Sequence, residues 1–293
     1  MAKLGNLASR FLVAATIGPI VVFIIYLDRP EYTFTLVLLA AIVAMHEFFA
    51  MTLEDKRDQQ ASLFFGALCV IGLYWLQPIA LFKLPPEGYP PEGRVTLASL
   101  GPILVLCTAV IPVGLYYLFR FGDMKTVAAR FAYSVTGIVY VGLMLGFLAL
   151  MKRDFGQAGS DVVLFVLVVV WLGDTGAYFG GRFFGKRKLY PEVSPKKTWA
   201  GAVGGLLGSA ISAAVLKLLL MDYLSWTHTM ALAVPGAALG QMGDLVESLF
   251  KRSTGVKDSG SILPGHGGIL DRVDAVLFFA PYTYLYLSLV PAL

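Results

Sequence analysis

The sequence predicts an all-α integral membrane protein with about nine transmembrane helices. Of its 293 residues, 57% are hydrophobic and only 14% are charged, whereas a soluble domain carries about 25% charged residues. A soluble fold of this length cannot bury that much apolar surface, so lipid must solvate most of the chain. The apolar runs are long and continuous rather than alternating, which favours helices over the strands of a membrane barrel.

Nine hydrophobic stretches each approach the ~20 residues that a helix needs to cross a bilayer. They cover residues 11–27, 33–53, 61–82, 97–119, 131–151, 162–180, 199–220, 228–250 and 273–292. We expect an N-terminal part, 1–130, with about four of these helices, and a C-terminal part, 131–293, that carries the chemistry. Two basic, Gly-rich loops interrupt the second part, at Gly181–Thr198 and Lys251–Leu270.

The distribution of basic residues predicts the orientation. If nine helices alternate from a cytoplasmic N-terminus, 17 of the 23 Lys and Arg residues fall on the cytoplasmic side and five on the outer side, with Lys217 inside a helix. Cytoplasmic loops of membrane proteins carry an excess of Lys and Arg. The chain is therefore predicted to place its N-terminus and both Gly-rich loops in the cytoplasm.

Five carboxylates lie in or beside the apolar stretches of the second half. Asp174 follows the core of the sixth stretch, Asp244 and Glu247 fall near the end of the eighth, and Asp271 and Asp274 open the ninth. A carboxylate at bilayer depth is costly unless it meets a cation or a water-filled cavity, so each is a candidate functional residue. The alternative is that some of them only cap helix ends at the interface.

The spacing of these carboxylates indicates a cation. Asp271 and Asp274 are three residues apart and so share one helix face, and Asp244 and Glu247 repeat the pattern. Like charges held together repel unless a cation neutralises them. An all-oxygen ligand set suits a hard ion such as Mg²⁺. A cation-coupled transporter could show this pattern too, although acidic motifs in both halves would then be expected.

The two Gly-rich loops point to phosphate groups. Glycines let the backbone approach a phosphate closely, and basic side chains supply the countercharge. Membrane topology and attraction to anionic lipid are enough to explain a basic run such as Lys186–Lys188. They do not explain glycines, cations and carboxylates placed together between Lys251 and Asp274.

The stretch from Ser248 to Asp274 resembles the signature of the phosphatidate cytidylyltransferase (CDP-diacylglycerol synthase) family. The matching residues are Ser248, Lys251-Arg252, Lys257-Asp258, Pro264-Gly265-His266-Gly267-Gly268 and Asp271-Arg272-Val273-Asp274. Upstream, Asp174 to Tyr178, Gly181-Arg182 and Ser194-Pro195-Lys196-Lys197-Thr198 also look like family elements. One departure is the pair Ala200-Gly201, where the family usually has Glu-Gly.

The resemblance implies a reaction, a fold and a location. CTP and phosphatidic acid would give CDP-diacylglycerol and pyrophosphate for phospholipid synthesis. The fold would be a helix bundle around a polar cavity open to the cytoplasm, in the inner membrane of a bacterium, and family members can be homodimers. No nucleic acid partner is implied. A CTP-dependent kinase of a lipid alcohol is the alternative enzyme.

The resemblance also implies roles for individual residues. Asp244, Asp271 and Asp274 match the ligands of Mg²⁺, and a second ion such as K⁺ can share the site, with Asp174 binding it or orienting a lysine. Beyond the resemblance, the chemistry of the reaction gives His266 and Arg272 expected roles. His266 would contact a phosphate, protonate pyrophosphate or only shape the Gly-rich turn. Arg272 would clamp a phosphate through two hydrogen bonds. The other expected catalytic residues are Lys257 and Asp258, and the expected substrate-binding residues are Arg182, Ser194, Lys196, Lys197, Thr198, Ser248, Lys251, Arg252, Gly267 and Gly268.

Overall fold

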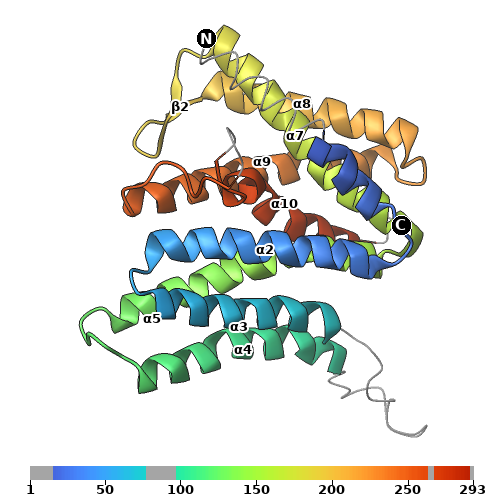
Figure 1. Cartoon of the computed structure of the whole chain (residues 1–293). Helices are drawn as coiled ribbons and strands as arrows, with labels where there is room; N and C mark the ends of the chain where they lie inside the picture. Colours follow the sequence, from blue (N-terminus) through green and yellow to red (C-terminus); the bar gives the residue numbers. More distant parts are fainter. Residues whose placement is uncertain (1–15, 77–96, 263–266, 291–293) are drawn as a thin grey trace, which may run out of the picture. The chain divides into compact units, whose positions relative to one another are not determined.

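The computed structural model describes residues 16–76, 97–262 and 267–290, and these are predominantly helical (Figure 1). A helical stretch Thr16–Ile25 comes first. It is followed by α2 (Pro30–Thr52), α3 (Lys56–Trp75), α4 (Leu97–Phe119), α5 (Val127–Thr136), the π-helix η1 (Gly137–Leu143), α6 (Met144–Asp154), the 3₁₀ turn η2 (Gly156–Ala158), α7 (Gly159–Phe184), α8 (Trp199–Leu219), α9 (Trp226–Ser253) and α10 (Leu270–Leu289). Each expected apolar stretch falls on a helix over the residues that are described.

Four helical segments of the described chain are long and apolar enough to cross a membrane. They are Pro30–Thr52, Val127–Asp154, Gly156–Phe184 and Trp199–Leu219. In lipid every backbone polar group must find its partner within the chain, and an unbroken helix meets this requirement. Length, composition and helicity together confirm the expected α-helical membrane protein.

The segment between α7 and α8 departs from the all-α expectation. Strands β1 (Lys188–Tyr190) and β2 (Ser194–Thr198) pair antiparallel, with Lys188 opposite Thr198 and Tyr190 opposite Ser194. The hairpin satisfies backbone groups of a polar segment that cannot continue either apolar helix. Its strands are too short and too polar to stand out in a hydrophobicity pattern.

Contacts divide the chain into two compact units, one formed by residues 1–37 and 147–293 and the other by 38–146. In the second unit, α3 packs on α4 and on η1. Asp58 of α3 is fully buried there, where it pairs with Arg130 at 2.7 Å and accepts a hydrogen bond from the Tyr116 hydroxyl at 2.8 Å.

In the first unit, α7 and α8 pack closely through small residues and lie side by side (Figure 1). A Cβ added to Gly180 would lie 2.7 Å from the Ala200 carbonyl oxygen, and one added to Gly208 would lie 2.7 Å from the Leu172 carbonyl oxygen. Small residues allow such close backbone approach between membrane helices. Because α9 packs on both α8 and α10, the hairpin and the acidic segments of α9 and α10 belong to the same unit.

Candidate active site

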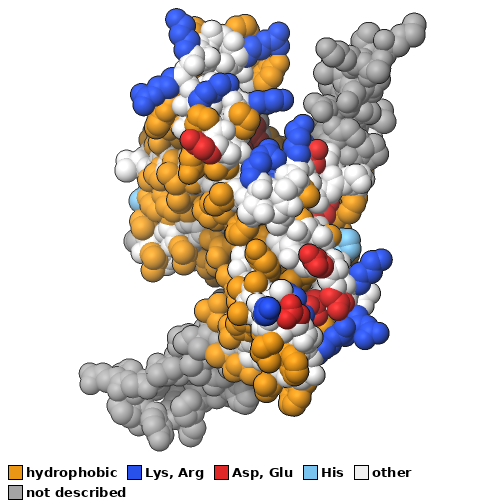
Figure 2. All heavy atoms as spheres, turned by 90° about the vertical axis from the view of Figure 1, so that its left-hand side faces the viewer, with side chains coloured by type: hydrophobic (Ala, Val, Ile, Leu, Met, Phe, Trp, Pro, Cys, Tyr) orange, Lys and Arg blue, Asp and Glu red, His pale blue; other side chains and the backbone are white. Residues whose placement is uncertain are grey.

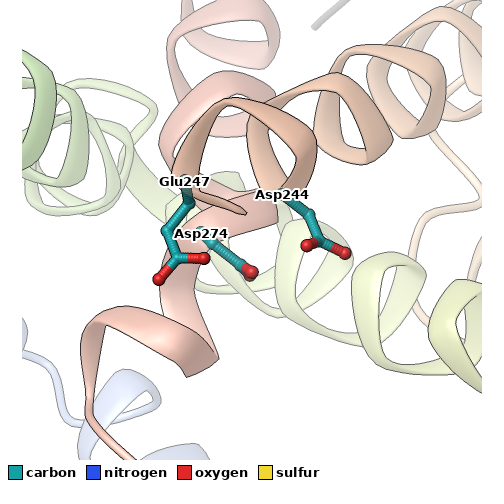
Figure 3. A group of neighbouring side chains, drawn as sticks. All are labelled: Asp244, Glu247 and Asp274. Atoms are coloured by element: carbon teal, nitrogen blue, oxygen red, sulfur yellow. The ribbon is translucent and has the colours of Figure 1, made fainter. Parts of the chain in front are cut away.

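Three carboxylates from two helices converge. Asp244 and Glu247 stand one turn apart on α9, and Asp274 faces them from α10 (Figure 3). Carboxylate oxygens of the three lie within 4.8 Å of one another. Asp174 of α7 is within electrostatic range of Asp244 and Asp274. The packing of α7, α9 and α10 therefore gathers four acidic side chains.

Two lysines offset part of this negative charge. Lys197 Nζ, from strand β2, lies 2.6 Å from Asp244 Oδ2. Lys251 Nζ lies 2.6 Å from Glu247 Oε2. The other oxygen of Glu247, Oε1, is buried and has no hydrogen-bond partner within the described part of the chain. A buried carboxylate oxygen without a partner is destabilising, and a bound cation would relieve that cost.

The carboxylate group fits a divalent cation. Ligands on opposite sides of Mg²⁺ are ~4.2 Å apart, twice the ~2.1 Å length of a magnesium–oxygen bond. Oxygens within 4.8 Å thus need only a small closing movement to share one ion. The donors of Asp244, Glu247 and Asp274 are all carboxylate oxygens, the set that hard cations prefer.

Asp271 lies outside this group of three and organises the loop before α10. Its carboxylate accepts hydrogen bonds from Lys251 Nζ at 2.6 Å and from the backbone amides of Ser259 at 3.1 Å and Gly268 at 2.9 Å. Burial alone would raise the pKa of Asp271, but the hydrogen bonds from Lys251 and Gly268 hold it below its usual range. The expected role of Asp271 as a metal ligand stays a prediction.

Gly267 shows why this loop is rich in glycine. It adopts φ of +80°, and a Cβ at this position would lie 2.7 Å from Asp271 Oδ2. A side chain would therefore be strained and would also displace the carboxylate that holds the loop.

The end of α9 explains the position of Lys251 and Arg252. The amide of Val256 donates to the carbonyl of Lys251 at 2.9 Å, the amide of Gly255 donates to that of Arg252 at 3.2 Å, and Gly255 has φ of +76°. This is a Schellman motif, which ends a helix and reverses the chain. The loop thereby turns back toward Asp271 directly after the two basic residues.

The hairpin positions the first set of expected substrate-binding residues. Strand β2 brings Lys197 to Asp244, leaves Lys196 exposed and leaves Ser194 half-buried. Thr198 is buried, and its hydroxyl oxygen caps α8 by accepting the Gly201 amide hydrogen bond at 3.1 Å. Arg182, which the sequence groups with these residues, donates to the Tyr178 hydroxyl at 2.6 Å.

The remaining expected residues differ in burial and in their partners. Ser248 is buried next to Glu247, Arg252 donates to the Val256 carbonyl at 2.9 Å, and Arg272 is exposed within electrostatic range of Asp174. Lys257 and Asp258 are exposed on the loop, and His266 lies outside the described residues.

Two residues of the site differ from the set that the resemblance implies. Glu247 is a candidate from its spacing with Asp244, but it is not among the ligands that the resemblance implies. Gln241, one turn before Asp244, lines a small pocket with Asp174 and Ser209. Its side-chain amide donates to the Ala202 carbonyl at 3.1 Å and so links α9 to the start of α8. A single glutamine in an apolar helix gives no pattern from which this contact could be predicted.

Comparison with known proteins agrees with the resemblance. The model of the Cytidylyltransferase family matches residues 8–290. The phosphatidate cytidylyltransferase of Thermotoga maritima is 35% identical over 285 residues, which cover 96% of each chain. That of Bacillus subtilis is 36% identical over 221 residues, 74% of this chain and 78% of the relative. That of Staphylococcus saprophyticus is 47% identical over 150 residues, 51% of this chain and 56% of the relative. This chain belongs to the cytidylyltransferase family.

Proposed function

We propose that this protein transfers the cytidylyl group of CTP to phosphatidic acid, giving CDP-diacylglycerol and pyrophosphate. Two kinds of observation support the proposal. The relatives carry the name phosphatidate cytidylyltransferase and match nearly the whole chain. The observation that carries it is the group Asp244, Glu247 and Asp274 on α9 and α10, with cations from both Gly-rich segments at its edge.

The reaction places specific demands on such a site. A phosphate oxygen of phosphatidate attacks the α-phosphorus of CTP, the bond from that phosphorus to the β-phosphate oxygen breaks, and pyrophosphate leaves. The nucleophile is already an anion, so no strong general base is needed. Bringing two anions together in line, and neutralising the charge of the leaving group, should therefore dominate catalysis.

The carboxylate group would hold Mg²⁺. Asp244, Glu247 and Asp274 offer the oxygens, and the expected ligand Asp271 is one helical turn from Asp274. Asp174, which lies within electrostatic range of Asp244 and Asp274, would bind a second ion such as K⁺. When bound, Mg²⁺ neutralises phosphate oxygens of CTP and stabilises the charge of departing pyrophosphate.

The basic residues fall into two groups with different roles. Lys196, Arg252, Lys257 and Arg272 are exposed and are proposed to bind the triphosphate and the lipid phosphate. Lys251, by contrast, is buried between Glu247 and Asp271. Its proposed role is to hold these carboxylates in place rather than to contact a phosphate.

The finer description of the membrane protein belongs to the same proposal. Nine spans with a cytoplasmic N-terminus would put both Gly-rich segments on the cytoplasmic side of a bacterial inner membrane, as the distribution of Lys and Arg supports. The polar cavity would open to the cytoplasm, and acyl chains would enter between helices, because crossing water is costly for them. A homodimer is consistent with the resemblance.

The test is product analysis with the purified protein, phosphatidate, Mg²⁺ and CTP labelled at the α-phosphate. The proposal predicts label in the lipid phase, abolished by EDTA and by Asp274→Asn but not by Asp161→Asn, a matched carboxylate change near the start of α7. Lipid label from γ-labelled CTP alone would instead establish a lipid kinase. Folded protein that labels no lipid with either nucleotide would overturn the proposal.

A further inference from the structure

The end of α7 and the hairpin carry a surface that the proposed reaction does not use. We call it the hairpin surface, and it consists of Phe184, Lys186, Arg187, Lys188, Tyr190 and Trp199. All six side chains are exposed, with Phe184 at 75%, Tyr190 at 50% and Trp199 at 50% of full exposure. Large aromatic side chains left open beside a cluster of cations mark an interaction surface rather than a folding core.

The charge of this surface is strongly one-sided. Residues 185–198 include five Lys or Arg and a single acidic residue, Glu192. Lys197 is the one of these cations that pairs with a carboxylate in the described chain, at Asp244. Arg187 lies over the ring of Trp199, 6.0 Å from its centroid. Figure 2 shows basic side chains gathered at the upper end of the face, among hydrophobic ones.

The two flanking helices determine which partner lies within reach. Both α7 and α8 are long and apolar enough to span a membrane, and the hairpin joins them directly. Exposed apolar side chains continue from the hairpin surface along both helices, including Phe179 on α7 and Val203 on α8. A bilayer spanned by α7 and α8 would meet water near the hairpin that joins them, and aromatic side chains prefer that position.

We infer that the hairpin surface binds the headgroups of anionic lipids. The aromatic side chains lie among headgroups and the first acyl carbons, while Lys186, Arg187 and Lys188 contact lipid phosphates. Each basic residue near an anionic leaflet strengthens such binding by a factor of about five. A zwitterionic surface offers no net charge to complement the three cations.

This surface has a consequence that rests on the proposed function. Phosphatidate is itself an anionic lipid, so the hairpin surface raises its local concentration. Strand β2 then leads directly from this surface to Lys197 at Asp244. The lipid substrate is thus collected next to the site that consumes it.

The direct test measures quenching of Trp199 by lipid. The other tryptophans, Trp75, Trp171 and Trp226, are replaced by Phe, and the protein is reconstituted with brominated phosphatidylglycerol or brominated phosphatidylcholine. We expect the anionic lipid to quench Trp199 with an apparent affinity about fivefold higher or more. Raising the ionic strength should reduce this preference, because exposed charges are screened. Equal quenching by the two lipids would overturn the inference.

Variants separate the cations from the rest of the fold. K186Q/R187Q/K188Q should remove the lipid preference, whereas K217Q, near the other end of α8, should keep it. In the transfer assay the triple variant should raise the half-saturating mole fraction of phosphatidate by at least about fivefold, the contribution of one basic residue, with kcat unchanged. A triple variant that keeps the full preference would overturn the inference. Absence of transfer activity in the unmodified protein would count against the proposed function alone, because Trp199 quenching does not depend on catalysis.

Discussion

Replacing Lys251 with Met should destabilise the protein far more than removing an exposed ion pair. The Lys251 side chain is 11% exposed, and its two partners, Glu247 and Asp271, are 0% and 11% exposed. Lys251→Met leaves both carboxylates buried without their cation. Breaking a buried pair in this way costs about 3–5 kcal/mol, because the remaining charge is uncompensated.

Arg120→Met is the matched control. Arg120 pairs with Asp55 at 3.1 Å, and the two side chains are 36% and 47% exposed. Exposed pairs contribute about 0–1 kcal/mol. The measurement is the free energy of unfolding in mixed micelles with increasing dodecyl sulfate, followed by circular dichroism, with EDTA present so that metal binding does not contribute.

A double variant identifies why Lys251→Met loses stability. Adding Glu247→Gln to Lys251→Met removes one stranded charge, so the double variant should be more stable than the sum of the single changes predicts, with a coupling of about 0.5–3 kcal/mol. A loss of stability in Lys251→Met no larger than in Arg120→Met, or additive effects of the changes at Lys251 and Glu247, would contradict this prediction.

Three further predictions concern the elements that position the site. Gly180→Ala should destabilise the protein by about 1–3 kcal/mol, because its Cβ would lie 2.7 Å from the Ala200 carbonyl; Gly18→Ala, with nothing within 4 Å, is the control in the same unfolding assay. Thr198→Ala should cost about 1 kcal/mol by removing the cap of α8, and Thr198→Ser should restore most of it. The pKa of Asp271 is lower in the folded protein than in the unfolded chain. The ionised carboxylate therefore stabilises the loop fully at any pH above its unfolded pKa of about 3.9, and this stabilisation is lost as the pH falls through its folded pKa. Amide hydrogen exchange at Gly268, corrected for its intrinsic pH dependence, should therefore stay protected at pH 5, and early loss of protection there would contradict this.

The helices could be predicted from sequence because their signal is local. Each apolar run must form its own backbone hydrogen bonds in lipid, whatever its neighbours do. The spacing of Asp244 and Glu247 is equally local, since residues three apart share one helix face. That Asp274 joins them depends on how α10 packs on α9. No periodicity gives this packing, and at the sequence level only the family resemblance placed Asp244 and Asp274 together.

Contacts that form only when a loop folds back could not be predicted from the sequence in the same way. The hydrogen bonds from Ser259 and Gly268 to Asp271 require a loop that returns to its own start, and no periodicity encodes this. Lys251 looked like a phosphate ligand because it is basic, and its burial between two carboxylates reveals a different environment. Thr198 was expected to bind substrate, and the structure shows that its hydroxyl caps α8.

The dependence of cytidylyl transfer on Mg²⁺ concentration shows whether the carboxylates of α9 and α10 hold the ion that the reaction uses. We expect the unmodified protein to transfer the α-phosphate label to lipid with saturable dependence on Mg²⁺. Glu247→Gln should raise the half-saturating Mg²⁺ concentration by tenfold or more, about 1.4 kcal/mol of binding free energy. Asp161→Asn should leave it unchanged. Equal Mg²⁺ dependence in the unmodified protein and Glu247→Gln would show that the carboxylate group of α9 and α10 does not hold the ion that the reaction uses.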